Sequence, residues 1–250
     1  MDTLKVSFAG LDRSGKTSIL STLQNKFTIP QTRPTLGVER HDLTQTQWLG
    51  ITVHSFDLGG QKALRQKHLV NPLFFQRLTA FFFLIDIQDS ERFQEALEYL
   101  HQIVQKLSQM KESPRIVIIF SKADPEIIES NGIPQKIKDL QQKITEFASE
   151  FQITFHATSI HNLSSIADAF YEGVIKLSPK SQLISKALKE YAEMTKSSAV
   201  ILLDESLLIV GAETTVPNLE ETCQDYLSKL YNTRSEERRV GKECRSRRSP

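Results

Sequence analysis

Residues 10–17, GLDRSGKT, are the feature that most limits what this chain can fold into. They match the pattern G-x-x-x-x-G-K-[S/T] and lie between the apolar run LKVSFAG and a helical pattern over 16–27. In a strand, loop and helix in this order, the loop N–H groups and the helix N-terminus converge on one point, where they can bind an anion. The sequence therefore predicts a phosphate-binding loop in an α/β fold.

The loop supplies several candidate contacts for a nucleotide. Lys16 is expected to bridge β- and γ-phosphate oxygens, and the Thr17 hydroxyl is expected to ligate Mg²⁺. A glycine-rich turn before a helix would share this spacing, but the motifs further along the chain agree with phosphate binding. The predicted contacts in this segment are Gly10, Asp12, Arg13, Ser14, Gly15, Lys16, Thr17 and Ser18.

A candidate switch residue lies in the polar segment after the first predicted helix. Thr35, in the run PTLG, is positioned to close over the nucleotide when a γ-phosphate and Mg²⁺ are present. A Pro-Thr pair by itself favours an ordinary turn, so the assignment depends on the neighbouring motifs. Arg33 could act as an internal arginine finger, but a solvent-facing residue that contacts a partner is the favoured interpretation.

The run DLGGQ follows the apolar stretch ITVHSF, which places Asp57 at a strand end beside the phosphates. We expect Asp57 to hold Mg²⁺ through water, together with the ligands Thr17 and Thr35. The Gly60 N–H can reach the γ-phosphate, and Gln61 can orient the attacking water, so Gln61, Lys16 and Thr35 are the predicted catalytic residues. Without the upstream loop, a strand ending in a Gly-Gly turn would be the simpler interpretation.

Two later strand ends carry candidate base contacts. The run SKAD ends the apolar stretch RIVIIF, and its Asp124 carboxylate can accept hydrogen bonds from guanine N1 and N2 while the Lys122 stem packs over the ring. The run SKAD resembles the N/T-K-x-D element of GTPases, in which asparagine is commoner at the position of Ser121, so a weaker contact with the phosphate loop is expected. Ser159 and Ile160 follow the last strand and resemble the fifth GTPase element, in which a backbone N–H near Ile160 would meet guanine O6.

Apolar runs alternate with amphipathic stretches through residues 1–178. Strands are predicted at 4–10, 80–87, 115–121 and 151–158, with two more meeting near 48–57. Helices are predicted at 16–27, 63–77, 91–110, 134–150 and 163–177. This order predicts a mostly parallel, six-stranded sheet with helices on both faces and ligands at the carboxyl ends of its strands.

The chain changes character after residue 178. A helix near 181–194, two short strands around a turn at 204–206, and a helix at 219–231 predict a small, partial α+β domain over 179–233. Residues 234–250 carry 7 basic and 3 acidic side chains and no periodicity. Their sequence closely resembles translated adaptor read-through, so we treat them as a non-native or disordered tail and expect the natural protein to be longer.

Composition excludes several classes of protein. The formal net charge of +1 gives no global basic surface for nucleic acid. No apolar run reaches the roughly 18 residues of a membrane span, and the N-terminus lacks a secretory leader pattern. Asp2 replaces the glycine that N-myristoylation needs, and Cys223 and Cys244 are too few for a disulfide framework. We expect a cytoplasmic protein that meets membranes only through partners.

The motifs resemble two branches of the Ras-like small GTPase superfamily. GLDRSGKTS, PTLG and DLGGQ resemble the Arf side, whereas HATSIHNLSSIADAFYEGVIKL and the short α+β unit after it resemble Rag GTPases. The superfamily resemblance covers residues 3 to about 178, and the Rag resemblance covers about 115–232. The mixture indicates a deep-branching Rag/Arf-like GTPase of archaeal or environmental origin. Asp2 and the lack of an amphipathic N-terminal helix do not support Arf-style membrane switching.

The resemblance implies a P-loop NTPase small G domain that binds GTP or GDP with Mg²⁺ and hydrolyses GTP slowly without an activating protein. It also implies exchange and activating proteins as partners, a role in signalling or membrane trafficking, and a hetero- or homodimer through a longin or roadblock-like C-terminal domain. Two alternatives stay open: a GTP-binding scaffold with negligible turnover, and another P-loop phosphotransferase such as a nucleotide kinase.

Overall fold

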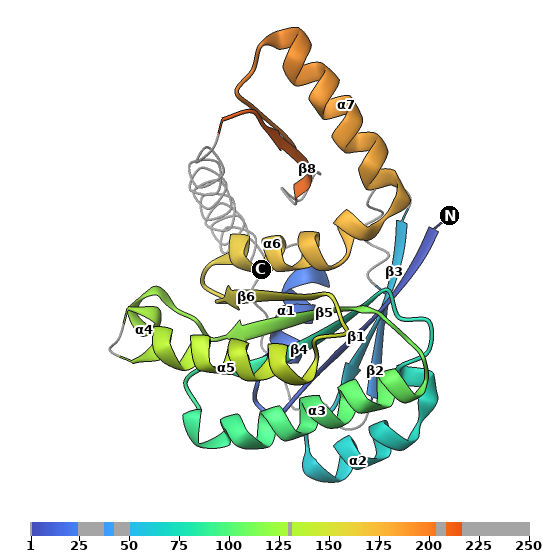
Figure 1. Cartoon of the computed structure of the whole chain (residues 1–250), viewed down its shortest axis with the longest axis vertical. Helices are drawn as coiled ribbons and strands as arrows, with labels where there is room; N and C mark the ends of the chain where they lie inside the picture. The colour runs from blue at the N-terminus through green and yellow to red at the C-terminus, as the bar shows by residue number, and fades with distance from the viewer. Residues whose placement is uncertain (1, 25–37, 43–50, 130–131, 204–208, 217–250) are drawn as a thin grey trace, which may run out of the picture.

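A six-stranded sheet lies at the centre of the structure (Figure 1), a computed structural model that describes residues 2–24, 38–42, 51–129, 132–203 and 209–216. The strand order is β2-β3-β1-β4-β5-β6; β2 pairs antiparallel with β3, and the other neighbours pair in parallel. The strands are β1 (Asp2–Gly10), β2 (Val38–Asp42), β3 (Ile51–Leu58), β4 (Ala80–Asp86), β5 (Arg115–Ser121) and β6 (Ile153–Thr158). The predicted fold class is confirmed.

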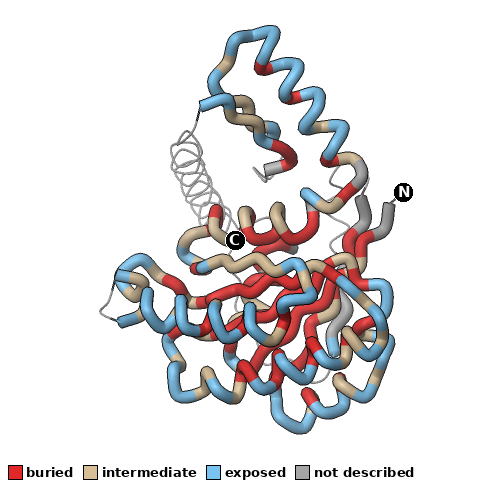
Figure 2. The backbone as a smooth tube through the Cα atoms, in the orientation of Figure 1, coloured by how far each residue is buried: buried red, intermediate tan, exposed pale blue. Residues whose placement is uncertain are grey.

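Helices cover both faces of this sheet (Figure 1). One face carries α1 (Lys16–Gln24) and α6 (Leu163–Gly173), and the other carries α2 (Lys62–Val70), α3 (Phe93–Gln109) and α5 (Ile133–Phe147). Because both faces are covered, the central strands need apolar residues at consecutive positions, which explains the run AFFFLI in β4. Figure 2 shows the resulting layer of buried backbone through the middle of the molecule.

Alternate residues of β4 enter the two cores. Phe82 packs under α1 and α6, where its ring stacks on Phe8 at 4.5 Å between centroids and lies 6.0 Å from Phe170. Phe81 and Phe83 face the other core, beneath α3 and α5. These two cores hold the strands in register, so the carboxyl ends of β1, β3, β4, β5 and β6 form one edge.

Several predicted helices end earlier than expected. The helix predicted at 63–77 ends at Val70, because Pro72 lacks a backbone N–H and disfavours helical geometry at Asn71. A short 3₁₀ turn, η2 (Pro72–Phe74), follows. The Asn71 side chain accepts a hydrogen bond at 3.1 Å from the N–H of Leu73, a residue of this turn. The other short elements are η3 (Ser90–Arg92), α4 (Pro125–Ile128) and η4 (Ile175–Leu177), the last of which takes the end of the helix predicted at 163–177.

A smaller unit follows the six-stranded sheet. Helix α7 (Pro179–Thr195) leads into β7 (Ala199–Leu203) and β8 (Ile209–Thr214), which form a two-stranded antiparallel sheet. A Cβ at Gly211 would lie 2.7 Å from Ile184, so β8 packs directly on α7. The domain boundaries at 178 and 233 stay predictions, and the predicted helix 219–231 and the tail 234–250 lie outside the described residues.

Candidate nucleotide-binding site

The phosphate loop joins β1 to α1 in the predicted place, and its backbone conformation and close packing require glycine at two positions. Gly10 has a φ of +146°, and a Cβ there would lie 2.5 Å from the Leu84 carbonyl oxygen and 2.9 Å from Ser14 Oγ. Gly15 has a φ of +85°, in the left-handed region that side chains rarely adopt. Arg13 also lies in that region, at +64°. The loop is therefore a tightly wound backbone pressed against β4.

Lys16 lies across this loop with its side chain buried. Its Nζ donates to the carbonyl oxygens of Gly10 at 3.2 Å and Leu11 at 2.7 Å, and to Ser14 Oγ at 3.3 Å. Burial lowers the pKa of the Lys16 ammonium to about 8, although Asp57 and Asp12 oppose the shift. The Lys16 ammonium over the loop therefore has too little negative charge around it, and the phosphates of a nucleotide can supply that charge.

Two oxygen ligands from distant elements meet beside Lys16. Thr17, at the start of α1, donates from Oγ1 to Asp57 Oδ2 at 2.6 Å, and Asp57 is fully buried near the end of β3. A hydroxyl and a carboxylate are the hard oxygen donors that Mg²⁺ takes, so this pair fits the predicted metal. Thr35, the third predicted ligand, lies outside the described residues, as does Arg33. In the described part of the chain, no group of three or more His, Cys, Asp or Glu side chains could hold a metal ion.

The segment before α2 lies directly against the phosphate loop. The Asp12 N–H donates to the Gly60 carbonyl oxygen at 3.1 Å, and a Cβ at Gly60 would lie 2.2 Å from the Asp12 nitrogen. Gln61 is the N-cap residue of α2, and its side chain is exposed. Its carbonyl oxygen accepts the N–H groups of Leu64 at 2.9 Å and Arg65 at 3.0 Å. The position of Gln61 therefore follows the first turn of α2.

The predicted base-recognition residues meet at the ends of β5 and β6. The Ser159 hydroxyl hydrogen-bonds the Asp124 carboxylate, and the Ala123 N–H donates to the Thr158 carbonyl oxygen at 2.9 Å. Ser159 Oγ also accepts the His161 N–H at 3.0 Å, which shapes the turn that contains the half-buried Ile160. The two predicted base motifs, far apart in sequence, form one structural unit.

Ser121 connects this unit to the phosphate loop. Its hydroxyl lies 2.8 Å from the Ser14 carbonyl oxygen and 3.2 Å from that of Ile85, so it contacts the loop as the commoner asparagine is expected to do. The next residue, Lys122, has a φ of +57° and an ion pair with Asp86 at the end of β4. The phosphate and base ends of the site therefore lie on one continuous edge of the sheet.

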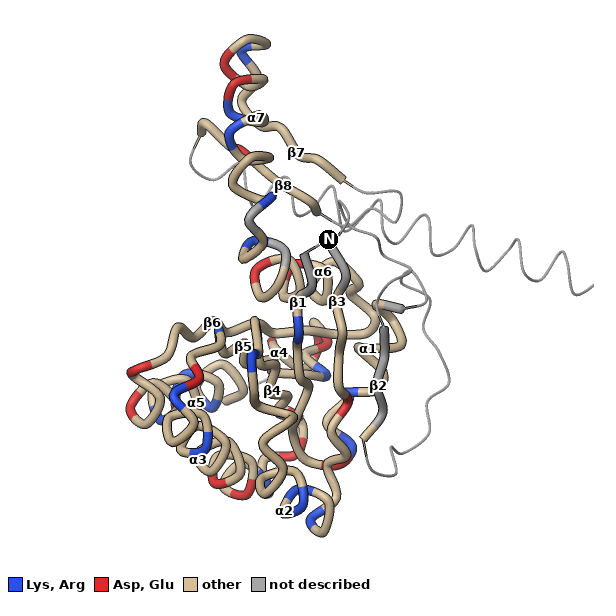
Figure 3. Tube along the Cα trace, turned by 90° about the vertical axis from the view of Figure 1, so that its right-hand side faces the viewer, with Lys and Arg blue, Asp and Glu red and all other residues tan. Residues whose placement is uncertain are grey.

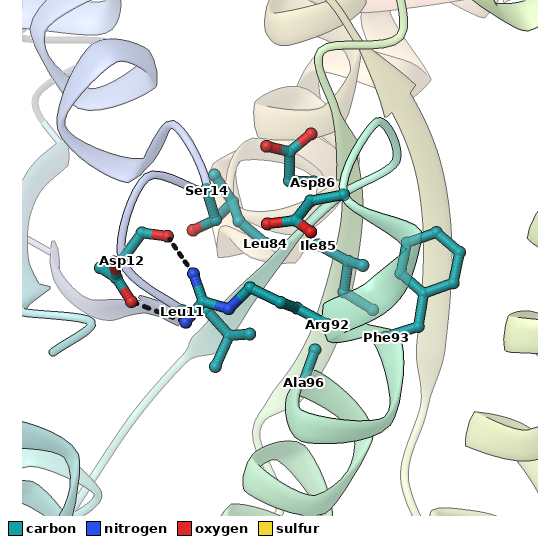
Figure 4. Close-up of a pocket in the computed structure, with 10 residues that line it drawn as sticks. Leu11, Asp12, Ser14, Leu84, Ile85, Asp86, Arg92, Phe93 and Ala96 are labelled. Atoms are coloured by element: carbon teal, nitrogen blue, oxygen red, sulfur yellow. Dashed lines mark hydrogen bonds and ion pairs between the residues drawn. The ribbon is translucent and has the colours of Figure 1, made fainter. Parts of the chain in front are cut away.

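The sequence did not identify Asp86 and Arg92 as parts of this region. Asp86 pairs in register with Ser121, and its place at the end of an apolar strand could have identified it. Arg92 donates from Nη2 to Asp12 Oδ1 at 2.7 Å across 80 residues of sequence, for which no local pattern exists. Beside this pair is a recess of about 10 Å³ (Figure 4), enough for one water rather than a ligand.

Comparison with known proteins places this geometry among G proteins. The model of the Gtr1/RagA G protein conserved region matches residues 5–231. ADP-ribosylation factor-like protein 4C of Homo sapiens is 34% identical over 122 residues, which are 46% of this chain and 59% of that protein. Protein 4A of the same group, also from Homo sapiens, is 36% identical over 121 residues, which are 46% of this chain and 56% of that protein. The chain thus spans less than two thirds of these relatives.

Solved structures agree on the fold. The Arl6 BBS3 small GTPase from Trypanosoma brucei, with a bound nucleotide analogue, superposes with a TM-score of 0.56 at 16% identity over 70% of this chain and 97% of that one. The mammalian SRP receptor superposes with a TM-score of 0.51 at 19% identity over 62% of this chain and 91% of that one. At these identities, the likeness concerns the fold alone.

Proposed function

The chain belongs to the Gtr1/RagA G-protein family, and on that premise we propose that it is a GTP-binding switch that hydrolyses GTP slowly to GDP and phosphate. The observation that carries the proposal is the contact of Ser121 with Ser14, which joins the phosphate loop to the base-recognition unit. One nucleotide can then engage both ends of the same sheet edge. This is the arrangement expected where parallel strands end together.

Each end of the site has a chemical task in this proposal. Lys16 and the loop N–H groups neutralise charge on the phosphates, and the Asp124 carboxylate accepts hydrogen bonds from guanine N1 and N2. Gln61 orients the water that attacks the γ-phosphate in line with the leaving oxygen. Thr17 and Asp57, with Thr35, would hold Mg²⁺, which would offset the negative charge of the phosphates.

Substitution at Asp124 tests the guanine assignment. Asp124→Asn replaces an acceptor oxygen with an amide donor, so affinity for GDP should fall about 100-fold, about 2.7 kcal/mol. The variant should gain affinity for xanthosine diphosphate, whose ring carries an acceptor oxygen at C2. Competition against a fluorescent GDP analogue measures both, with ATP as the comparison nucleotide. If ATP competes as well as GTP against the wild-type protein, the guanine-specific proposal is wrong and a different P-loop phosphotransferase is favoured.

Turnover separates the switch from the scaffold alternative. A scaffold would retain bound GTP unchanged, whereas the proposed switch converts it to GDP within a single turnover. Gln61 favours the switch, since it lies exposed at the start of α2, beside a Gly60 that contacts the phosphate loop. Phosphate release from preloaded protein distinguishes the two.

We further propose that the C-terminal unit pairs with a second copy of this chain or a related subunit. Leu183, Tyr191 and Met194 of α7 are exposed by 69%, 57% and 84%, and their spacing places them on one side of the helix. Acidic and basic residues share the rest of α7 (Figure 3). An apolar side of this kind is typical of an interface.

A further inference from the structure

A series of ion pairs between alternating acidic and basic side chains connects the phosphate loop to helix α2. Arg92 donates to Asp12 at 2.7 Å and, through Nε, to Glu95 Oε2 at 2.9 Å. The second oxygen of Glu95 accepts from Arg65 Nη2, on α2. The order Asp12, Arg92, Glu95, Arg65 thus runs from the loop, across the start of α3, to the segment that follows Gln61.

The Arg65 end of this series of ion pairs is buried. The Arg65 side chain is 8% exposed, and its guanidinium lies over the Tyr99 ring at 5.2 Å from the centroid. A buried arginine is costly without a partner, so the pair with Glu95 is needed to keep it there. The Arg65 N–H also donates to the Gln61 carbonyl oxygen at 3.0 Å. Fixing Arg65 therefore fixes the first helical turn that begins at Gln61.

At the Asp12 end of this series of ion pairs, Arg92 compensates for a negative charge in the phosphate loop. An anionic side chain in a phosphate-binding loop repels the ligand unless a cation compensates for it. The Arg92 guanidinium faces both the Asp12 carboxylate and the Asp12 carbonyl oxygen (Figure 4). Its hydrogen bond holds the pKa of Asp12 below the usual range, which keeps this pair ionised.

We propose that Arg92 and Glu95 are positioning residues for GTP hydrolysis, which hold Arg65, and through it Gln61, against the phosphate loop. The proposal rests on the GTPase function proposed above. A second connection between the same two segments is the hydrogen bond from the Asp12 N–H to the Gly60 carbonyl oxygen at 3.1 Å. Together these contacts couple the loop to both the start and the first turn of α2.

The charges can be removed without unfolding α3. That helix is anchored by buried side chains along its length, among them Leu100, Ile103 and Leu107. Glu95 is 37% exposed and lies in its first turn. Glu98, one turn further along, is exposed on the same helix and forms no ion pair with another described residue, so Glu98→Gln is a matched control for the loss of one negative charge.

The test measures single-turnover GTP hydrolysis and GTP affinity in the full chain. Glu95→Gln should slow hydrolysis about tenfold, which is about 1.4 kcal/mol, and change GTP affinity less than threefold. Glu98→Gln should match wild type in both. Arg65→Gln should slow hydrolysis to a similar extent, and the double variant should be no slower than either single variant, because both break one contact. Arg65→Lys, which keeps the charge, should recover part of the rate.

Each other outcome has a defined meaning. Hydrolysis by Glu95→Gln within twofold of wild type, or multiplied effects in the double variant, overturns the positioning proposal alone. A wild-type protein that keeps its bound GTP overturns the proposed hydrolysis and this proposal with it. If Glu95→Gln does not fold, Arg92→Lys replaces it: lysine keeps the charge but cannot reach both carboxylates as a fork, so a severalfold loss of rate supports the proposal and an unchanged rate overturns it.

Discussion

The phosphate-loop edge and the C-terminal unit are built on different principles. In β4, which supports the loop, the first six residues are buried, whereas none of the five residues of β7 is. The loop edge is closed by hydrogen bonds across long sequence separations, such as Ser121 to Ser14 over 107 residues. The C-terminal unit has two strands and one helix, with an apolar side exposed on α7. The first region is shaped to hold a ligand, and the second leaves apolar surface exposed, where we propose that a partner binds.

The largest effect is expected where the loop touches β4. Gly10→Ala places a Cβ 2.5 Å from the Leu84 carbonyl oxygen at a φ of +146°, so it should lower the free energy of unfolding by about 3 kcal/mol or more. Gly132→Ala is the control, because Gly132 has a φ of +93° and no atom within 4 Å, so only about 1 kcal/mol of backbone strain applies. Chemical denaturation measures both. Equal losses would contradict the tight loop packing.

A slightly smaller effect is expected at the exposed side of α7. Replacing Leu183, Tyr191 and Met194 together by glutamine should weaken self-association or subunit pairing at least 100-fold, about 2.7 kcal/mol, since large apolar side chains dominate interface energies. Nucleotide affinity should stay unchanged. Light scattering over a dilution series measures the association. A wild-type chain that stays monomeric and also fails to pair with a related subunit would remove the proposal.

At Lys16, we expect the affinity for GDP to fall about tenfold per pH unit well above pH 8. Its pKa of about 8 means that the free protein loses this charge above pH 8, while bound phosphates need the ammonium. GDP binding should therefore take up about 0.75 proton at pH 8.5 and almost none at pH 7, and affinity should fall above pH 8. Calorimetry in two buffers of different ionisation enthalpy measures the uptake. The same uptake at both pH values would contradict the buried-lysine account.

The smallest effect concerns α6, the helix against which the C-terminal unit packs. Burial, with Glu172 nearby, raises the pKa of Asp168 to about 6. Above pH 6 the folded state therefore carries a buried, charged carboxylate that destabilises it, and this carboxylate takes up a proton as the pH falls. Asp168→Asn should therefore raise the free energy of unfolding by about 1 kcal/mol at pH 7.5 and not at pH 4. The exposed Asp139→Asn on α5 is the control. A gain that is equal at both pH values would contradict the burial cause.

The contrast also explains what the sequence could predict. The place of the phosphate loop between β1 and α1 was predicted from the motif, because its spacing is local in sequence. The contacts of Lys16 with its own loop were not predicted, because the motif assigns that amine to phosphate oxygens. The meeting of Asp57 with Thr17 followed from the rule that parallel strand ends share an edge. Arg92 beside Asp12 could not be anticipated, because the pairing depends on how α3 approaches the loop rather than on any spacing. The end of α2 was missed although Pro72 marks it in the sequence.

Bound GTP gives the most direct test of the central claim. Wild-type protein and Gln61→Leu are loaded with GTP and Mg²⁺, and the phosphate released in one turnover is measured. The account predicts that wild type converts its GTP to GDP, while Gln61→Leu binds GTP within threefold of wild type and releases phosphate at least tenfold more slowly. Equal rates of release from the two proteins would contradict the role of Gln61 as the residue that orients the attacking water.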